Sequence, residues 1–313
     1  MSSDRRSLDK NAIQYHYDLS NDFYKLFLDP LMVYTCGYYR NPNGTLEAAQ
    51  EDKLDLVCRK LRLKPGERLL DIGCGWGSLA LWAAKHYGVK SLGVTLAVEQ
   101  VRYANEWIKR EGLEDVCRVE HLDYRDIDAK GQPFDKISAI GIIEHIGLEN
   151  YPGYFKEVHE LLVPGGIFLN HGITRSRHWQ WSPQWDFLIE NVFPNGELIH
   201  VSHITETMET ENFEILDVES LRPHYARTCQ HWVERLEANR KAAVALVGER
   251  TYRIWKLYLT SSSIGFEQGS INLHQVVASR ANPAVRPAPT TREEIYAPND
   301  ARKPLARAHA QGQ

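Results

Sequence analysis

The stretch LLDIGCGWG, residues 69–77, is the strongest local indication of the fold. It begins as an apolar strand, and Gly73, Gly75 and Gly77 follow before a segment with helical spacing. A glycine-rich turn between a strand and a helix lets the backbone pass close to a ligand held at the helix N-terminus. The same pattern without a ligand would be a tight turn only, so the glycines alone do not identify what binds.

The spacing of these glycines argues against NAD. Dinucleotide fingerprints use G-x-G-x-x-G and an acidic residue at the end of the second strand, about 20 residues later. Here the spacing is G-x-G-x-G, and Asp71 precedes it. The second strand ends in Val94, Thr95 and Leu96, none of which is acidic. The segment from Asp71 to Gly77 resembles the S-adenosylmethionine motif of class I methyltransferases.

Strands and helices alternate along most of the chain. The candidate strands RLLDIG, KSLGVT, CRVEHLD, KISAIGII and GIFLNHGIT are separated by segments with helical spacing. FEILDVESL, two helices and SINLHQVVASR, a candidate closing strand, follow them. This order predicts an α/β fold with a doubly wound, mostly parallel sheet. The resemblance of the glycine loop implies the class I methyltransferase (Rossmann-like) form of this fold, a seven-stranded sheet with N-terminal and inserted helices.

Three segments are expected. Residues 1–60 form an N-terminal helical cap, and residues 61–280 form the S-adenosylmethionine-dependent methyltransferase domain with helical insertions. Residues 281–313 are rich in Pro, Ala and charge and poor in large apolar residues, which predicts a disordered tail. In the cap, Thr45 is placed as the N-cap of a helix that runs to about residue 61.

Composition excludes several classes of protein. With 313 residues, 43% of them hydrophobic, the chain can bury its core without disulfides or metals. Its five cysteines form no CxxC pair, which argues against a disulfide framework and a structural zinc site. No apolar run approaches about 18 residues, and the first ten residues lack a signal-peptide pattern. We expect a cytoplasmic protein, with peripheral contact at the inner face of the membrane as a further expectation. A formal charge of −4 gives no support to a nucleic-acid role.

The strand KISAIGII runs directly into Glu144 and His145. Ligands of open α/β sheets lie beyond the carboxyl ends of the strands near the switch point. Glu144 is therefore expected in that crevice, beside a transferable methyl group. For an isolated glutamate, the simpler interpretation is a helix-start carboxylate stabilised by the helix dipole.

The wider pattern narrows the choice. Along residues 10–280 the chain contains, in order, HYDLSNDFYKLFLD, YTCGYY, LLDIGCGWGSLA, GVTLAVEQ, DYRD, EHIG, FPNGELI, HYARTCQHW and YLTSSSIGF. This series resembles cyclopropane fatty acid synthases and the related mycolic acid cyclopropane synthases and methyltransferases. The resemblance implies an enzyme that transfers a methylene or methyl group from S-adenosylmethionine to the double bond of an unsaturated fatty acyl chain. It also implies a carbocation that is deprotonated by bound bicarbonate to give a cyclopropane fatty acid.

The resemblance also implies roles for particular residues. For bicarbonate they are the side chains of Glu144, His171 and Tyr225, the backbone N–H groups of Cys36 and Gly141, and the carbonyl of Ile140. Tyr17, in the HYD motif, is a further catalytic candidate. For the cofactor they are Tyr34, Thr35, Leu69, Asp71, Gly73, Cys74, Gly75, Trp76, Gly77, Thr95, Leu96, Gln100, Tyr124 and Arg125. No metal ligand is implied. Taken singly, His171 could be a core histidine and Cys36 a small buried apolar residue.

Three alternatives stay open at this stage. A fatty acyl C-methyltransferase would use the same carbocation to make a methyl branch or a hydroxyl. A small-molecule N-methyltransferase is disfavoured by the intact Cys36, His171 and Tyr225. A non-catalytic cofactor-binding protein is disfavoured by the intact glycine loop and carboxylate. The expected partner is an unsaturated fatty acyl lipid, either a phospholipid or carrier-bound.

Overall fold

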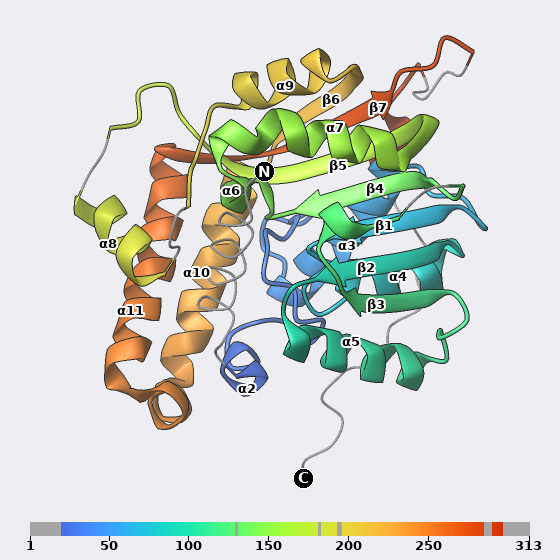
Figure 1. The fold of residues 1–313 in the computed structure, drawn as a ribbon. Helices are drawn as coiled ribbons and strands as arrows, with labels where there is room; N and C mark the ends of the chain where they lie inside the picture. The colour runs from blue at the N-terminus through green and yellow to red at the C-terminus, as the bar shows by residue number, and fades with distance from the viewer. Residues whose placement is uncertain (1–19, 129–130, 181–182, 193–195, 285–289, 297–313) are drawn as a thin grey trace.

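The computed structural model describes residues 20–128, 131–180, 183–192, 196–284 and 290–296. Within these ranges the strands form one seven-stranded sheet in the order β3-β2-β1-β4-β5-β7-β6 (Figure 1). The strands are β1 (Arg68–Ile72), β2 (Lys90–Thr95), β3 (Cys117–His121), β4 (Phe134–Ile140), β5 (Leu162–Arg175), β6 (Phe213–Ser220) and β7 (Ile271–Arg280). Strands β1 to β5 pair in parallel, whereas β7 is antiparallel to both β5 and β6. The predicted doubly wound, seven-stranded sheet is confirmed.

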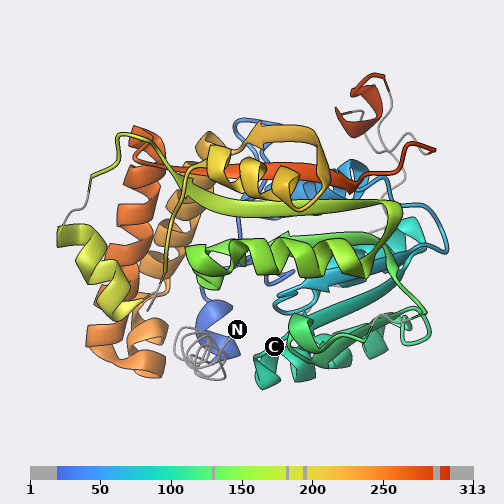
Figure 2. The same ribbon diagram turned by 45° about the horizontal axis from the view of Figure 1, so that its top comes forward.

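Helices cover both faces of this sheet and one of its ends. They are α2 (Asn21–Tyr24), α3 (Leu46–Lys60), α4 (Ser78–Tyr87), α5 (Val98–Glu111), α6 (Ile143–Ile146), α7 (Tyr151–Leu161), α8 (Pro183–Asn191), α9 (Val201–Thr210), α10 (Arg222–Ala238), α11 (Arg240–Gln268) and α12 (Glu293–Tyr296), with 3₁₀ turns η1 (Tyr124–Asp126) and η2 (Leu148–Asn150). Figures 1 and 2 both show α2, α8, α10 and α11 beside the carboxyl ends of the strands. This helical layer encloses the edge of the sheet where a ligand is expected. No helix in the described ranges has both the length and the apolar character needed to cross a membrane.

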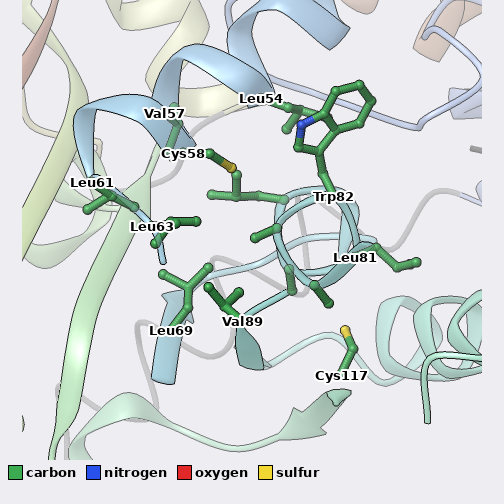
Figure 3. Packing of buried hydrophobic residues seen from close by; sticks show 14 of the residues in the cluster. Leu54, Val57, Cys58, Leu61, Leu63, Leu69, Leu81, Trp82, Val89 and Cys117 are labelled. Atoms are coloured by element: carbon green, nitrogen blue, oxygen red, sulfur yellow. The ribbon is translucent and has the colours of Figure 1, made fainter. Parts of the chain in front are cut away.

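Helix α3 attaches the N-terminal segment to the sheet. Thr45 is its N-cap, as predicted, and the Thr45 side chain accepts a hydrogen bond from the Ala48 N–H at 3.3 Å. Leu54, Val57 and Leu61 recur at helical spacing and are all buried against β1 and α4 (Figure 3). The packing of this apolar face fixes the polar face of α3 relative to the ends of β1 and β4.

The aromatic residues of the N-terminal segment form a second core with α10 and α11. Phe23, Tyr24, Tyr252 and Trp255 are buried there, and the Phe23 and Trp255 rings lie 5.4 Å apart in an edge-to-face arrangement. These side chains therefore pack the core, and none of them lines the cavity described below.

Part of the predicted disordered tail is ordered. Ile295, in α12, is only 7% exposed and packs near α3. Arg292 forms an ion pair with Asp217 of β6 at 2.7 Å. For residues 290–296 the expectation of disorder is corrected, because Ile295 and Arg292 find partners that composition does not reveal. Residues 297–313 lie outside the described residues.

Candidate active site

A cavity of about 340 Å³ lies at the switch point of the sheet. Strands β1 and β4 are neighbours there, with β2 on the far side of β1 and β5 on the far side of β4. The loop after β1 and the segment after β4 both line the cavity. This is the position in which open α/β sheets bind ligands.

The glycine loop leaves room for a ligand. Gly73, Gly75 and Gly77 have φ of 67°, 55° and 84°, values that only glycine adopts readily. A methyl group at Gly73 would lie 1.9 Å from Cδ1 of Ile142, so this glycine permits a close approach within the protein. A methyl group at Gly75 would meet no atom within 4 Å, so the open side of the loop is at Gly75. Gly77 instead serves packing, since its added carbon would lie 3.0 Å from Cβ of Ala104.

Most of the predicted cofactor residues line this cavity. They are Tyr34, Thr35, Asp71, Gly73, Cys74, Gly75, Trp76, Thr95, Leu96, Gln100, Tyr124 and Arg125. Leu69 and Gly77 do not line it, and Leu69 is fully buried in the core behind the glycine loop. Arg125 is held by its neighbour, donating from Nε and Nη2 to the two carboxylate oxygens of Asp123 at 2.8 and 2.6 Å.

Two polar pairs shape the cofactor end of the cavity. Asp71 is buried and accepts a hydrogen bond from the Ser138 hydroxyl at 2.7 Å. Burial raises the pKa of Asp71 to about 6, although Ser138 and the positive charge of Lys53 oppose the rise. Thr95 donates from its hydroxyl to Oε1 of Gln100 at 2.8 Å. This bond fixes the amide of Gln100 at the end of β2.

Glu144, in α6, also lines the cavity. Its Oε1 accepts a hydrogen bond from the Ile173 N–H at 2.7 Å, while its Oε2 is buried without a hydrogen-bond partner among the described residues. Burial raises the pKa of Glu144 to about 7, and the Ile173 N–H opposes the rise. A carboxyl with this pKa can both accept and release a proton near neutral pH.

His171 and Tyr225 come from different elements of the fold. Nδ1 of His171, on β5, contacts Nε2 of Gln275 on β7 at 3.1 Å, while Nε2 of His171 is buried without a partner among the described residues. Burial keeps the pKa of His171 well below its usual value. Tyr225, on α10, lines the cavity together with Glu144, and its ring stacks on Phe266 at 4.5 Å. His171 itself does not line the cavity.

One of the predicted bicarbonate contacts, the Gly141 N–H, is engaged elsewhere. The Gly141 N–H donates to the carbonyl of His171 at 2.8 Å, which continues the pairing of β4 and β5. The prediction that Gly141 offers a free N–H is therefore corrected. Cys36 is fully buried, and its thiol contacts the carbonyl of Gly37 at 3.1 Å. Ile140 lines the cavity, and Tyr17 lies outside the described residues.

The other end of the cavity is mostly apolar. Trp185, Leu188 and Ile189 of α8 line one side of it, and Phe266 and Ile271 line another. Further lining residues are Trp179, Tyr258, Ser261, Ser262, Gly265 and Ser270. We call this end of the cavity the apolar arm. Its chemistry suits a hydrocarbon chain, because few polar groups would be desolvated when such a chain binds.

Three polar residues that contact the site were not predicted from the sequence. Lys53 lines the cavity, Ser138 holds Asp71, and Gln275 contacts His171. One signal existed for Lys53, which lies next to Leu54 on a helix whose apolar face was identified. Ser138 and Gln275 lie within strands, where only the register of the sheet shows what they touch.

Comparisons with known proteins match this geometry. The family described as mycolic acid cyclopropane synthetase matches residues 4–276. A probable fatty acid methyltransferase of Pseudomonas putida is 46% identical over 300 residues, which cover 94% of this chain and 75% of that protein. A probable fatty acid methyltransferase of Mycobacterium tuberculosis is 43% identical over 278 residues, which cover 89% of this chain and 64% of that protein.

A solved structure agrees with the sequence matches. Mycolic acid cyclopropane synthase CmaA1, complexed with SAH (S-adenosylhomocysteine) and CTAB, superposes with a TM-score of 0.82 at 35% identity, covering 86% of this chain and 98% of that one. The match of nearly the whole sheet and its helices, together with the family match, extends well beyond the glycine loop. The chain is an enzyme that belongs to the mycolic acid cyclopropane synthetase family of S-adenosylmethionine-dependent methyltransferases.

Proposed function

We propose that this protein transfers the methyl carbon of S-adenosylmethionine to the double bond of an unsaturated fatty acyl chain and closes a cyclopropane ring. One observation carries the proposal: the glycine loop, the apolar arm and Glu144 all line a single cavity, and Oε2 of Glu144 has no hydrogen-bond partner among the described residues. A cofactor and a hydrocarbon chain could meet in such a cavity beside a proton acceptor. The family match supports the same chemistry.

The residues at the glycine loop fit the cofactor. The open side of Gly75 leaves space for a ligand against the backbone, and Asp71 and Gln100 supply polar groups around it. S-adenosylmethionine, when bound, supplies a methyl group on a positively charged sulfur. The role of the chain's own residues is to orient this group toward the apolar arm and to keep water away from it.

The apolar arm would hold the acyl chain with its double bond facing Glu144. The cofactor, when bound, would supply its methyl carbon to the electrons of the double bond, and a positive charge would then develop on the adjacent carbon of the acyl chain. Tyr225 and Tyr258 line the cavity, and an aromatic ring face turned toward this charge would stabilise it by about 0.5–2 kcal/mol. Leu188 and Phe266 would exclude the water that could otherwise add to it.

Ring closure needs a group that removes a proton from the added carbon. Bicarbonate, when bound, would supply the acceptor, and Glu144, His171 and Tyr225 would hold it. Oε2 of Glu144, which is buried without a partner among the described residues and lines the cavity, supports this role. Nε2 of His171 also lacks a partner among them, but His171 does not line the cavity, and the Gly141 N–H donates to the His171 carbonyl. The pKa of Glu144, about 7, also suits a direct role as proton acceptor. Turnover in bicarbonate-depleted buffer separates the two possibilities, since only the first requires the anion.

A second candidate is a fatty acyl C-methyltransferase. It is favoured by two relatives that share more identity with this chain than CmaA1 does and are named as fatty acid methyltransferases. A hydride shift followed by loss of a proton would leave a branched alkene with the same mass as the ring product. Ozone cleaves the alkene but leaves the cyclopropane intact, so it distinguishes the two.

The experiment combines purified protein, methyl-labelled S-adenosylmethionine and a panel of acyl lipids. The panel holds unsaturated phospholipids in vesicles, unsaturated carrier-bound thioesters and the matched saturated lipids. Label should enter only the unsaturated acyl chains, and Glu144→Gln should abolish this transfer. Label in saturated lipids, or in an amine substrate alone, would contradict the proposal. The vesicle arm also tests the predicted peripheral contact with membranes, through cosedimentation.

A further inference from the structure

Lys53 is a buried cation at the cofactor end of the cavity. It is 2% exposed and lines the cavity from helix α3. Within the part of the chain that the structure describes, its ammonium donates one hydrogen bond, to the Thr35 hydroxyl, at 3.1 Å. An ammonium has three donors, and a neutral hydroxyl compensates poorly for removing its charge from water. Lys53 therefore has hydrogen-bonding capacity that its neighbours in the protein do not use.

No carboxylate among the described residues forms an ion pair with Lys53. Asp29 and Asp71 are close enough to influence its charge, but neither carboxylate lies within ion-pair distance of it. Asp29 accepts hydrogen bonds from the N–H groups of Leu31 and Val33 at 2.9 and 3.0 Å. Asp71 accepts the hydroxyl of Ser138. Burial lowers the pKa of Lys53 to about 8, which is the direction expected of a cation that lacks a close counter-charge.

Arg125 is the other strongly basic residue that lines the cavity within the described ranges, and it is already paired. It makes a two-bond contact with Asp123. An anionic group entering the cofactor end of the cavity would therefore find its counter-charge at Lys53.

We propose that Lys53 binds the carboxylate of the amino-acid part of the cofactor, with Asp71 nearby for the ammonium of the same group. This inference rests on the proposed function, because it assumes that S-adenosylmethionine occupies the cavity. Lys53 is then a positioning residue, since anchoring the amino-acid end directs the methyl group toward Glu144. The pairing of opposite charges across one part of the cavity matches a zwitterionic ligand.

A purely structural role for Lys53 is the competing explanation. Gln50 already holds the same segment, since its amide donates to the Thr35 carbonyl at 2.8 Å. If Lys53 only supported Thr35, its replacement would weaken the binding of every cofactor analogue to the same extent. If it binds the carboxylate, only analogues that carry a carboxylate should be affected.

The test measures binding by calorimetry with two probes. S-adenosylhomocysteine carries the carboxylate, and S-adenosyl-3-thiopropylamine lacks only that group. Lys53→Met should weaken the binding of S-adenosylhomocysteine by about 30-fold or more, as expected when a buried charge pair loses one partner. The variant should leave the amine analogue within about threefold of its original affinity, since no charge pair is lost there. Lys53→Arg should restore part of the preference for the carboxylate.

Lys60→Met is the matched control. Lys60 is an equally buried lysine on the same helix, but it pairs with Asp217 and Glu219 away from the cavity. This variant should lower stability and leave the affinity for both probes unchanged. Equal weakening of both probes by Lys53→Met, or no weakening of either, would overturn the inference. Failure of the unaltered protein to bind either probe would instead overturn the proposed function.

Discussion

Glu144→Gln should make the stability of the protein less dependent on pH. The substitution keeps an oxygen that can accept from the Ile173 N–H but removes the ionisable carboxyl. Burial raises the pKa of Glu144 from 4.5 to about 7 in the folded state. Between these pH values the folded protein holds a proton that the unfolded chain has released. The stability due to the neutral carboxyl is complete below pH 4.5 and is lost as the pH rises through about 7.

The magnitude follows from the size of the shift. At about 1.4 kcal/mol per pKa unit, the full effect on the free energy of unfolding is about 3 kcal/mol. The stability of Glu144→Gln relative to the unaltered protein should therefore increase by about 2–3 kcal/mol between pH 5 and pH 8. Asp29 and Asp71 also have raised pKa values. Both are present in Glu144→Gln and in the unaltered protein, so their effect cancels in the difference between the two free energies of unfolding.

Urea unfolding at several pH values measures this difference. Glu149→Gln is the control, because Glu149 lies five residues further along the chain and is exposed. Its stability should follow that of the unaltered protein at every pH. Parallel stability curves for Glu144→Gln and the unaltered protein would show that Glu144 is not held in a desolvated site. The reasoning that makes it a proton acceptor would then fail.

Three further predictions follow from other contacts. Gly73→Ala should lower the free energy of unfolding by more than about 2 kcal/mol, because it adds a strained φ and a clash with Ile142; unchanged urea unfolding would contradict this. Gln275→Leu removes the contact to Nδ1 of His171, so turnover should fall while S-adenosylhomocysteine affinity stays constant; calorimetry showing that both fall together would contradict it. Ile295→Ala should destabilise the protein by about 2 kcal/mol, because its side chain is buried; a variant as stable as the unaltered protein in urea would mean that α12 contributes nothing.

The fold could be predicted because its signals are local. The glycines at 73, 75 and 77 require backbone conformations that other residues avoid, and the apolar runs fix the order of strands. The order of the strands across the sheet could not be predicted in the same way. SINLHQVVASR, the last strand in the sequence, lies inside the sheet between β5 and β6, and no local pattern reveals this pairing.

Residues of the site could be predicted from the sequence only where they lie in recognisable motifs. Glu144 and Tyr225 both line the cavity, and each lies in a segment with a recognisable pattern. Lys53 was missed because a lysine on a helix is ordinarily solvated, and its burial depends on how α3 packs against the ends of β1 and β4. The hydrogen bond of the Gly141 N–H to His171 likewise depends on sheet register.

The most direct test of the account follows the hydrogens of the transferred methyl group. Purified protein is incubated with S-adenosylmethionine that carries a trideuterated methyl group and with an unsaturated phospholipid in vesicles. The masses of the acyl products are then measured by mass spectrometry. If a cyclopropane ring forms, we expect one added carbon that keeps two of its three deuterium atoms, because the third deuteron leaves at the Glu144 site as the ring closes. We also expect a product that ozone does not cleave. An acyl product that retains all three deuterium atoms, or the absence of label from the acyl chains, would contradict it.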